Sequence, residues 1–64
     1  MQAFSEKEII IAQYAAEGMT AQEIADAMFL SIETIRWYRK RMLRKADAKN
    51  FPELIAMLKD QNII

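Results

Sequence analysis

The chain has 64 residues, nine Lys or Arg, nine Asp or Glu and no net charge, and it contains neither Cys nor His. A chain of this length folds as one domain with a small core, and it lacks the usual ligands of zinc and iron sites, the commonest general base and the thiol nucleophile. We therefore expect a protein that is not an enzyme and that holds no metal and no cofactor.

Two further absences suggest where the protein works. The N-terminus has no signal-peptide pattern, and no apolar run approaches the roughly 18 residues of a membrane span. We expect a cytoplasmic protein that makes no membrane contact. One Gly, one Pro and no Val favour helices over strands, so the sequence predicts a single all-α domain over residues 1–64.

The first predicted helix covers about residues 5–17. Ser5 and Glu8 have the spacing of a capping box, and Gly18 is suited to the left-handed conformation that ends a helix. Ile9, Ile10 and Ile11 cannot all face the core, because successive side chains diverge by about 100°. We expect Ile9 or Ile10 to be an ordinary surface residue or a contact with a missing domain or a second subunit.

The second predicted helix is short, at about residues 21–28. Thr20 and Glu23 form its capping box, and Phe29 and Leu30 make the turn that follows. Ser31 is then a good N-cap for a third helix, at about residues 32–46. A short helix, a tight turn and a longer helix have the layout of a helix-turn-helix.

The charges are strongly segregated along the neutral chain. Residues 1–35 carry a net charge of −5, residues 36–49 carry +6, and residues 50–64 carry −1. The positive segment lies almost entirely on the third predicted helix. A local concentration of this kind attracts a polyanion even when the net charge is zero.

The third predicted helix has two chemically different sides. On a helical wheel its apolar stripe contains Ile35, Tyr38, Met42 and Ala46. The opposite side contains Glu33, Trp37, Lys40 and Arg44, with Arg36 and Arg41 at its borders. One side is therefore suited to a core and the other to an anion.

Two charged residues fall on or near the inner sides of their helices. Glu8 and Arg39 would each be costly to bury without a partner. We expect Glu8 to pair with Arg39 or, as the second choice, with Lys45, and so to join the first helix to the third.

The fourth predicted helix covers about residues 51–60. Asn50 and Glu53 suggest its cap, and Pro52 is tolerated in a first turn. Its apolar surface is wide for so short a helix, and it consists of Leu54, Ile55, Met57 and Leu58. These residues either form a dimer contact or close the core of the monomer.

Several short motifs follow one another at fixed spacing over residues 4–60. The first is Phe4-Ser5 with Glu8, and the second is Gly18 followed by Glu23-Ile24-Ala25. The third is Leu30-Ser31 with Thr34-Ile35-Arg36, and Arg44-Lys45 and the segment from Asn50 to Glu53 follow in register. With these motifs the chain resembles the LuxR/GerE-type helix-turn-helix, the effector domain of NarL- and FixJ-like response regulators, whose first three patterns are Leu-Thr-x-x-Glu, Gly-x-x-x-x-Glu-Ile-Ala and Leu-Ser-x-x-Thr-Val-Lys.

Some positions depart from the family pattern. Ala46-Asp47 stands where the family usually has Leu-Gly, and Gln22 replaces a common Lys. Trp37 and Tyr38 occupy positions more often held by a small or polar residue and by His. The face that would enter a groove is therefore unusual, so the DNA target cannot be taken from relatives.

The resemblance implies a four-helix domain of a transcription regulator that binds double-stranded DNA with its third helix. The positions that match base-contacting residues are Arg36, Trp37 and Lys40. The residues expected to contact the DNA backbone are Ser31, Thr34, Arg41, Arg44 and Lys45. The fourth helix corresponds to the family's dimerisation helix, so a homodimer on an inverted or tandem repeat is expected.

Some alternatives remain open at this stage. Trp37 contacts thymine methyls or sugars, or it packs against the second helix or a dimer partner. Tyr38 packs in the core or reaches a phosphate. The whole domain is either a DNA-binding regulator or a module whose basic helix binds an acidic protein, such as part of RNA polymerase. The chain is a free-standing regulator or the effector part of one with an N-terminal regulatory domain.

Overall fold

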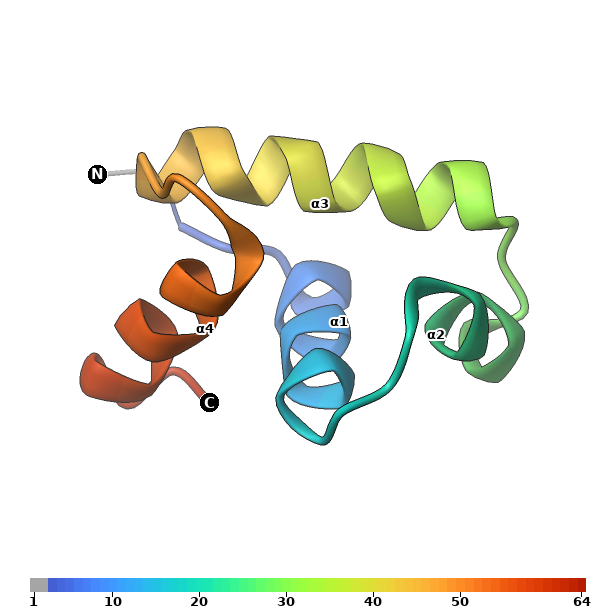
Figure 1. The fold of residues 1–64 in the computed structure, drawn as a ribbon, viewed down its shortest axis with the longest axis horizontal. Helices are drawn as coiled ribbons and strands as arrows, with labels where there is room; N and C mark the ends of the chain where they lie inside the picture. The colour runs from blue at the N-terminus through green and yellow to red at the C-terminus, as the bar shows by residue number, and fades with distance from the viewer. Residues whose placement is uncertain (1–2) are drawn as a thin grey trace.

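The computed structural model describes residues 3–64, which form four α-helices joined by short turns (Figure 1). The helices are α1 (Glu6–Ala16), α2 (Ala21–Met28), α3 (Ile32–Ala46) and α4 (Phe51–Asp60). This confirms the predicted all-α class, and each helix begins and ends within one residue of its expected bounds. Residues 1 and 2 belong to the predicted domain but lie outside the described residues.

The longest helix, α3, extends across the other three (Figure 1). It packs against α1, α2 and α4, and α1 in turn packs against α2 and α4. All the shorter helices therefore lie on one side of α3, and its opposite side is left uncovered. In the part of the chain that the structure describes, no helix is long and apolar enough to cross a membrane.

Each helix is preceded by the polar capping residue that the sequence predicts. The Oγ of Ser5 accepts a hydrogen bond from the Glu8 backbone N–H, and the Glu8 carboxylate accepts one from the Ser5 N–H. Thr20 and Glu23 form the same reciprocal pair. Ser31 and Asn50 cap α3 and α4 through their side-chain oxygens. These local hydrogen bonds satisfy backbone donors that have no partner inside the helix.

The core lies where the four helices meet. Its buried apolar residues are Ile11, Ala12, Ile24, Ala25, Ile35, Met42, Phe51, Leu54 and Leu58. Ile9 and Ile10 are only half-buried while Ile11 is fully buried, as the divergence of successive side chains requires. Tyr38 is half-buried and packs against the core cluster, which is the first of the two alternatives given for it.

Two of the four residues predicted for dimerisation have a different role. The exposed fractions of Leu54 and Leu58 are 0% and 1%, because both point from α4 into the monomer core. A side chain that is already covered within one subunit has no surface left to offer a second. The prediction for these two residues is corrected to core closure, whereas Ile55 and Met57 remain half-exposed.

All four helices end in the same way, with one residue of positive φ. The φ angles are +92° at Gly18, +57° at Phe29, +54° at Asp47 and +58° at Asn62. At each end the next backbone N–H returns to a carbonyl five residues earlier, as from Leu30 to Ala25 at 2.9 Å. This is the Schellman closure, which favours Gly. At Phe29 the closure is made by an aromatic residue whose side chain is 95% exposed.

We predict that Phe29→Gly stabilises the domain. A left-handed conformation costs a non-glycine residue about 1–2 kcal/mol, and part of this gain is offset by the entropy that Gly loses on folding. The free energy of unfolding should rise by about 0.5–1 kcal/mol, which for a domain of this size is a shift of a few degrees in Tm. Thermal unfolding followed by circular dichroism measures it.

Phe29→Ala is the matched control, because it removes the ring but keeps a Cβ at the same φ. Its Tm should stay near that of the wild type. A lower Tm for Phe29→Gly, or equal gains for the two variants, would contradict the assignment of strain to this backbone position.

Candidate nucleic-acid interface

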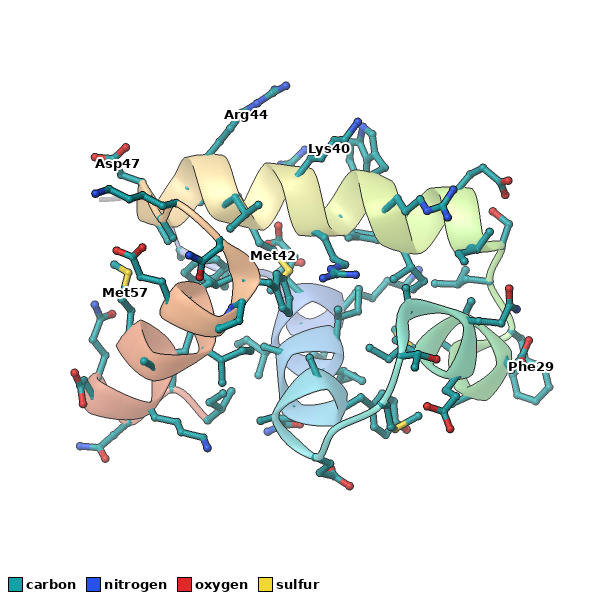
Figure 2. All side chains as sticks on the ribbon, viewed as in Figure 1. Phe29, Lys40, Met42, Arg44, Asp47 and Met57 are labelled. Carbon is teal, nitrogen blue, oxygen red and sulfur yellow. The ribbon has the colours of Figure 1, made fainter. Side chains whose placement is uncertain are left out.

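The uncovered side of α3 carries most of the exposed positive charge of the helix. Figure 2 shows Lys40 and Arg44 pointing away from the other helices, whereas Met42 on the same helix points toward them. Arg36 and Arg41 are also exposed. Because Ile35 and Met42 are fully buried, the 100° step per residue places these cations on the outer side.

The other two cations of α3, Arg39 and Lys45, are less exposed and are held by partners within the protein, whereas Arg41 stays exposed although its Nε lies 3.7 Å from Glu8. The Lys45 Nζ donates a hydrogen bond of 2.7 Å to the Glu8 carboxylate and one of 3.2 Å to the Ala3 carbonyl. The guanidinium carbon of Arg39 lies 4.5 Å from the centre of the Phe51 ring, a cation–π contact between α3 and α4. These two residues therefore hold α3 to its neighbours and leave four cations for the outer face.

Trp37 is the one large apolar residue on this outer face. It is 55% exposed, so it is not packed away against α2 within the monomer. Its ring meets the Tyr38 ring edge-on, with centroids 5.1 Å apart. The guanidinium of Arg41 lies 5.3 Å from the centre of the indole. The indole is therefore supported from two sides while much of it remains open to solvent.

The start of α3 is organised by two hydroxyl groups. The Ser31 Oγ accepts a hydrogen bond from the Thr34 N–H, and the two side-chain oxygens lie 2.9 Å apart. Ser31 is exposed and Thr34 is half-exposed. Both therefore fix the first turn of α3 and lie at its positive end, where a helix favours an anion.

Glu8 is a fully buried carboxylate that connects α1 to α3. One oxygen accepts hydrogen bonds from the Ser5 N–H and from Lys45, and the other lies 3.7 Å from the Nε of Arg41. The expected first-choice pairing with Arg39 is wrong, because Arg39 packs on Phe51 instead, and the second choice, Lys45, is the one formed. Burial raises the pKa of Glu8, but the hydrogen bonds from Lys45 and Ser5 outweigh it and hold the pKa below its ordinary value.

The comparisons with known proteins agree on a single family. Residues 2–58 match the family model of bacterial regulatory proteins of the LuxR family. The chain belongs to the LuxR family. It is 41% identical over 59 residues to BvgA of Bordetella pertussis, named as a positive transcription regulator of virulence factors. It is 30% identical over 54 residues to the DNA-binding transcriptional activator EvgA of Escherichia coli K12.

The LuxR-family relatives are much longer proteins. The matched segment covers 92% of this chain but only 28% of BvgA, and it covers 84% of this chain but only 26% of EvgA. The family match gives this domain the helix-turn-helix assignment that the sequence suggested, with α2 and α3 as its two helices. The family is described as regulatory proteins rather than as enzymes.

The structure brings most of the predicted DNA-contacting residues of this LuxR-family domain onto one side. Those that share the outer face or the start of α3 are Arg36, Trp37, Lys40, Arg41, Arg44, Ser31 and Thr34. Lys45 is separated from them, because only 10% of its side chain is exposed and its ammonium group is bound to Glu8. Sequence analysis missed the contact of Arg39 with Phe51, for which an aromatic residue at the start of α4 was the only signal.

We predict that Glu8→Gln destabilises the domain. The substitution removes the charge that Lys45 faces, and breaking a buried ion pair from one side costs on the order of 3–5 kcal/mol. Chemical unfolding of the wild type and the variant at pH 7 measures the difference. Glu53→Gln is a matched control, because Glu53 is an exposed first-turn acid of α4, and it should cost much less.

The same pair of proteins tests the pH dependence. Because the pKa of Glu8 is lower in the folded state, its contribution is complete above the unfolded-state pKa of about 4.3 and is lost as the pH falls through the folded value. Glu8→Gln should therefore lose less stability than the wild type on acidification below about pH 4. Parallel stability curves for the two proteins would contradict the proposed role of Glu8.

Proposed function

We propose that this LuxR-family domain binds double-stranded DNA sequence-specifically and regulates transcription, with α3 as the recognition helix in the major groove. The observation that carries the proposal is the group of four exposed cations and one indole on the uncovered side of α3. The major groove, about 12 Å wide, admits one α-helix. A positively charged helix face with the buried stripe behind it has the shape and charge for that groove.

We assign two kinds of contact to this face. Arg36, Trp37 and Lys40 lie in the N-terminal two-thirds of α3, and they would meet base edges. Ser31, Thr34, Arg41 and Arg44 would contact phosphates and fix the register of the helix without reading sequence. Lys45 would hold α3 in place through its bond to Glu8, and it would not contact the DNA backbone.

We also propose that the domain binds its target as a homodimer through α4. Met57 of α4 and Ile9 of α1 line the same apolar pocket on the surface, together with Phe4 and Ile63. These residues are half-exposed, so a second subunit has apolar surface to cover there. Two-fold symmetry would match a DNA site with two half-sites.

The length of the relatives supports a place for this domain in a larger regulator. We propose that an N-terminal regulatory domain controls it, and that RNA polymerase is a further partner on DNA. Because bacterial DNA lies in the cytoplasm, we expect the protein to act there.

We predict that the two kinds of contact separate in binding experiments. Arg36→Ala and Lys40→Ala should reduce discrimination between a selected site and unrelated DNA, since each bidentate base contact contributes about 1–3 kcal/mol. Arg44→Ala should weaken binding to all sequences and reduce the slope of log K against log salt by about 1. Fluorescence anisotropy at several salt concentrations measures both effects.

Equal loss of discrimination in all three variants would contradict this division of roles. Absence of binding to any fragment in pooled random DNA would contradict DNA binding itself. It would favour the alternative, in which the basic face of α3 binds an acidic protein.

We predict that two copies of the domain occupy a site with two half-sites and that Met57→Asp weakens the second binding event. A charge at Met57 would have to be desolvated in the apolar contact. Sedimentation velocity with and without DNA measures the stoichiometry, and Asp60→Asn on the same helix is the control. A single copy on the two-half-site DNA would contradict the dimer.

A further inference from the structure

We propose that Trp37 makes this domain a reader of the pyrimidine C5-methyl group, so that its sites carry thymine, or 5-methylcytosine, at the base pair that faces the indole. The inference rests on the proposed binding of α3 in the major groove. It goes further by naming the chemical group that this side chain selects.

Within the monomer the Trp37 ring is covered only in part, by Tyr38 and Arg41. More than half of its surface is exposed, and the residues around it on the outer side of α3 are charged. An exposed indole gains nothing for folding from the surface that it leaves in water. Its apolar surface therefore suits a group that meets it on binding.

The indole is held in place before any partner arrives. Tyr38 supports its edge at a centroid distance of 5.1 Å and an interplanar angle of 74°, and Tyr38 itself packs on the core. Arg41 lies over the ring at 5.3 Å, and its Nε is 3.7 Å from the buried carboxylate of Glu8. A side chain supported in this way loses little rotamer freedom on binding, which favours a specific contact.

The charges around Trp37 indicate that DNA is the partner. Arg36 precedes it, and Lys40 and Arg41 lie one turn further along the same helix, all of them exposed. Phosphates that flank a groove would be attracted to these cations and would bring the indole to the base edges between them. These charges are therefore complementary to a polyanion that has a groove, and this favours a nucleotide duplex as the partner.

Within the major groove, one kind of group matches an indole. Guanine, adenine and cytosine present hydrogen-bond donors and acceptors, whereas thymine adds its C5-methyl group. An indole placed over a polar base edge would desolvate that edge and offer only its single N–H in return. Contact with the methyl group has no such cost, and 5-methylcytosine carries the same group at the same position.

The test replaces thymine by deoxyuridine, which removes only the C5-methyl group. A binding site is first selected from random DNA with the wild-type domain, and each thymine is then replaced in turn. At the position facing Trp37 the wild type should bind the deoxyuridine site about three- to tenfold more weakly, the effect expected for one buried methyl group. Trp37→Ala should bind the thymine and deoxyuridine sites equally.

Two further arms make the result specific. Where the selected position is changed to cytosine, 5-methylcytosine should bind more tightly than cytosine to the wild type but not to Trp37→Ala. Trp37→Phe keeps an aromatic ring and should retain part of the thymine preference. Arg44→Ala should lower the affinity for both sites by the same factor and leave their ratio unchanged.

Three outcomes would overturn the proposal. In the first, replacing thymine by deoxyuridine does not change the affinity of the wild type at any position. In the second, the same sensitivity to deoxyuridine persists in Trp37→Ala. In the third, Trp37→Ala lowers the binding affinity for every site by the same factor, as expected for a sugar contact. In each of these cases the wild type still binds its selected site, so DNA binding by α3 stands. Failure to select any site would instead refute the proposed function and, with it, this inference.

Discussion

The burial of Ile35 and Met42 fixes the rotation of α3 about its own axis. These two side chains are seven residues apart, which is close to two helical turns, and both are fully buried against the shorter helices. Once they are in the core, the 100° step per residue fixes the direction of every side chain between them. Trp37 and Lys40 must face solvent, and the outer surface of the domain is a consequence of its inner packing.

The distribution of partners makes this surface positive although the chain as a whole is neutral. Lys45 is paired with the buried carboxylate of Glu8, and Arg39 packs on the Phe51 ring at the boundary between α3 and α4. Both contacts lie beside the buried stripe and tie α3 to its neighbours. The remaining cations of α3 have only Glu33 as an acidic neighbour on their helix. The same helix therefore uses its charges in two ways, for attachment on one side and for an exposed field on the other.

Local features of the fold were predictable from sequence, because they depend on residues three or four positions apart. The caps at Ser5, Thr20, Ser31 and Asn50 and the two sides of α3 are of this kind. The partner of Glu8 was not fixed by sequence, because Arg39 and Lys45 are both cations near the inner side and only the packing of α1 decides between them. For the candidate site, the sequence predicted which side chains lie together on the outer side of α3. It did not predict that Lys45 is separated from them by its pairing with Glu8.

The limits of sequence-based prediction at α2 and α4 have physical reasons as well. An apolar pattern on α4 does not say whether the covering surface is its own core or a second subunit, and Leu54 and Leu58 proved to be core. The sequence placed Phe29 in the turn after α2 but did not reveal its left-handed conformation, because a helix end of that kind normally has Gly or Asn. Its position follows from the lengths of α2 and α3, which leave only two residues between Met28 and Ser31.

The central claim is that the outer side of α3 meets DNA while its inner side stays in the core. NMR titration of the ¹⁵N-labelled domain with its selected DNA tests this most directly, since every backbone amide and the indole N–H report separately. The account predicts large shift changes at Arg36, the Trp37 indole and Lys40, with small changes at Leu54 and Leu58. Shift changes centred on α1 or α4, with the Trp37 indole unmoved, would contradict it.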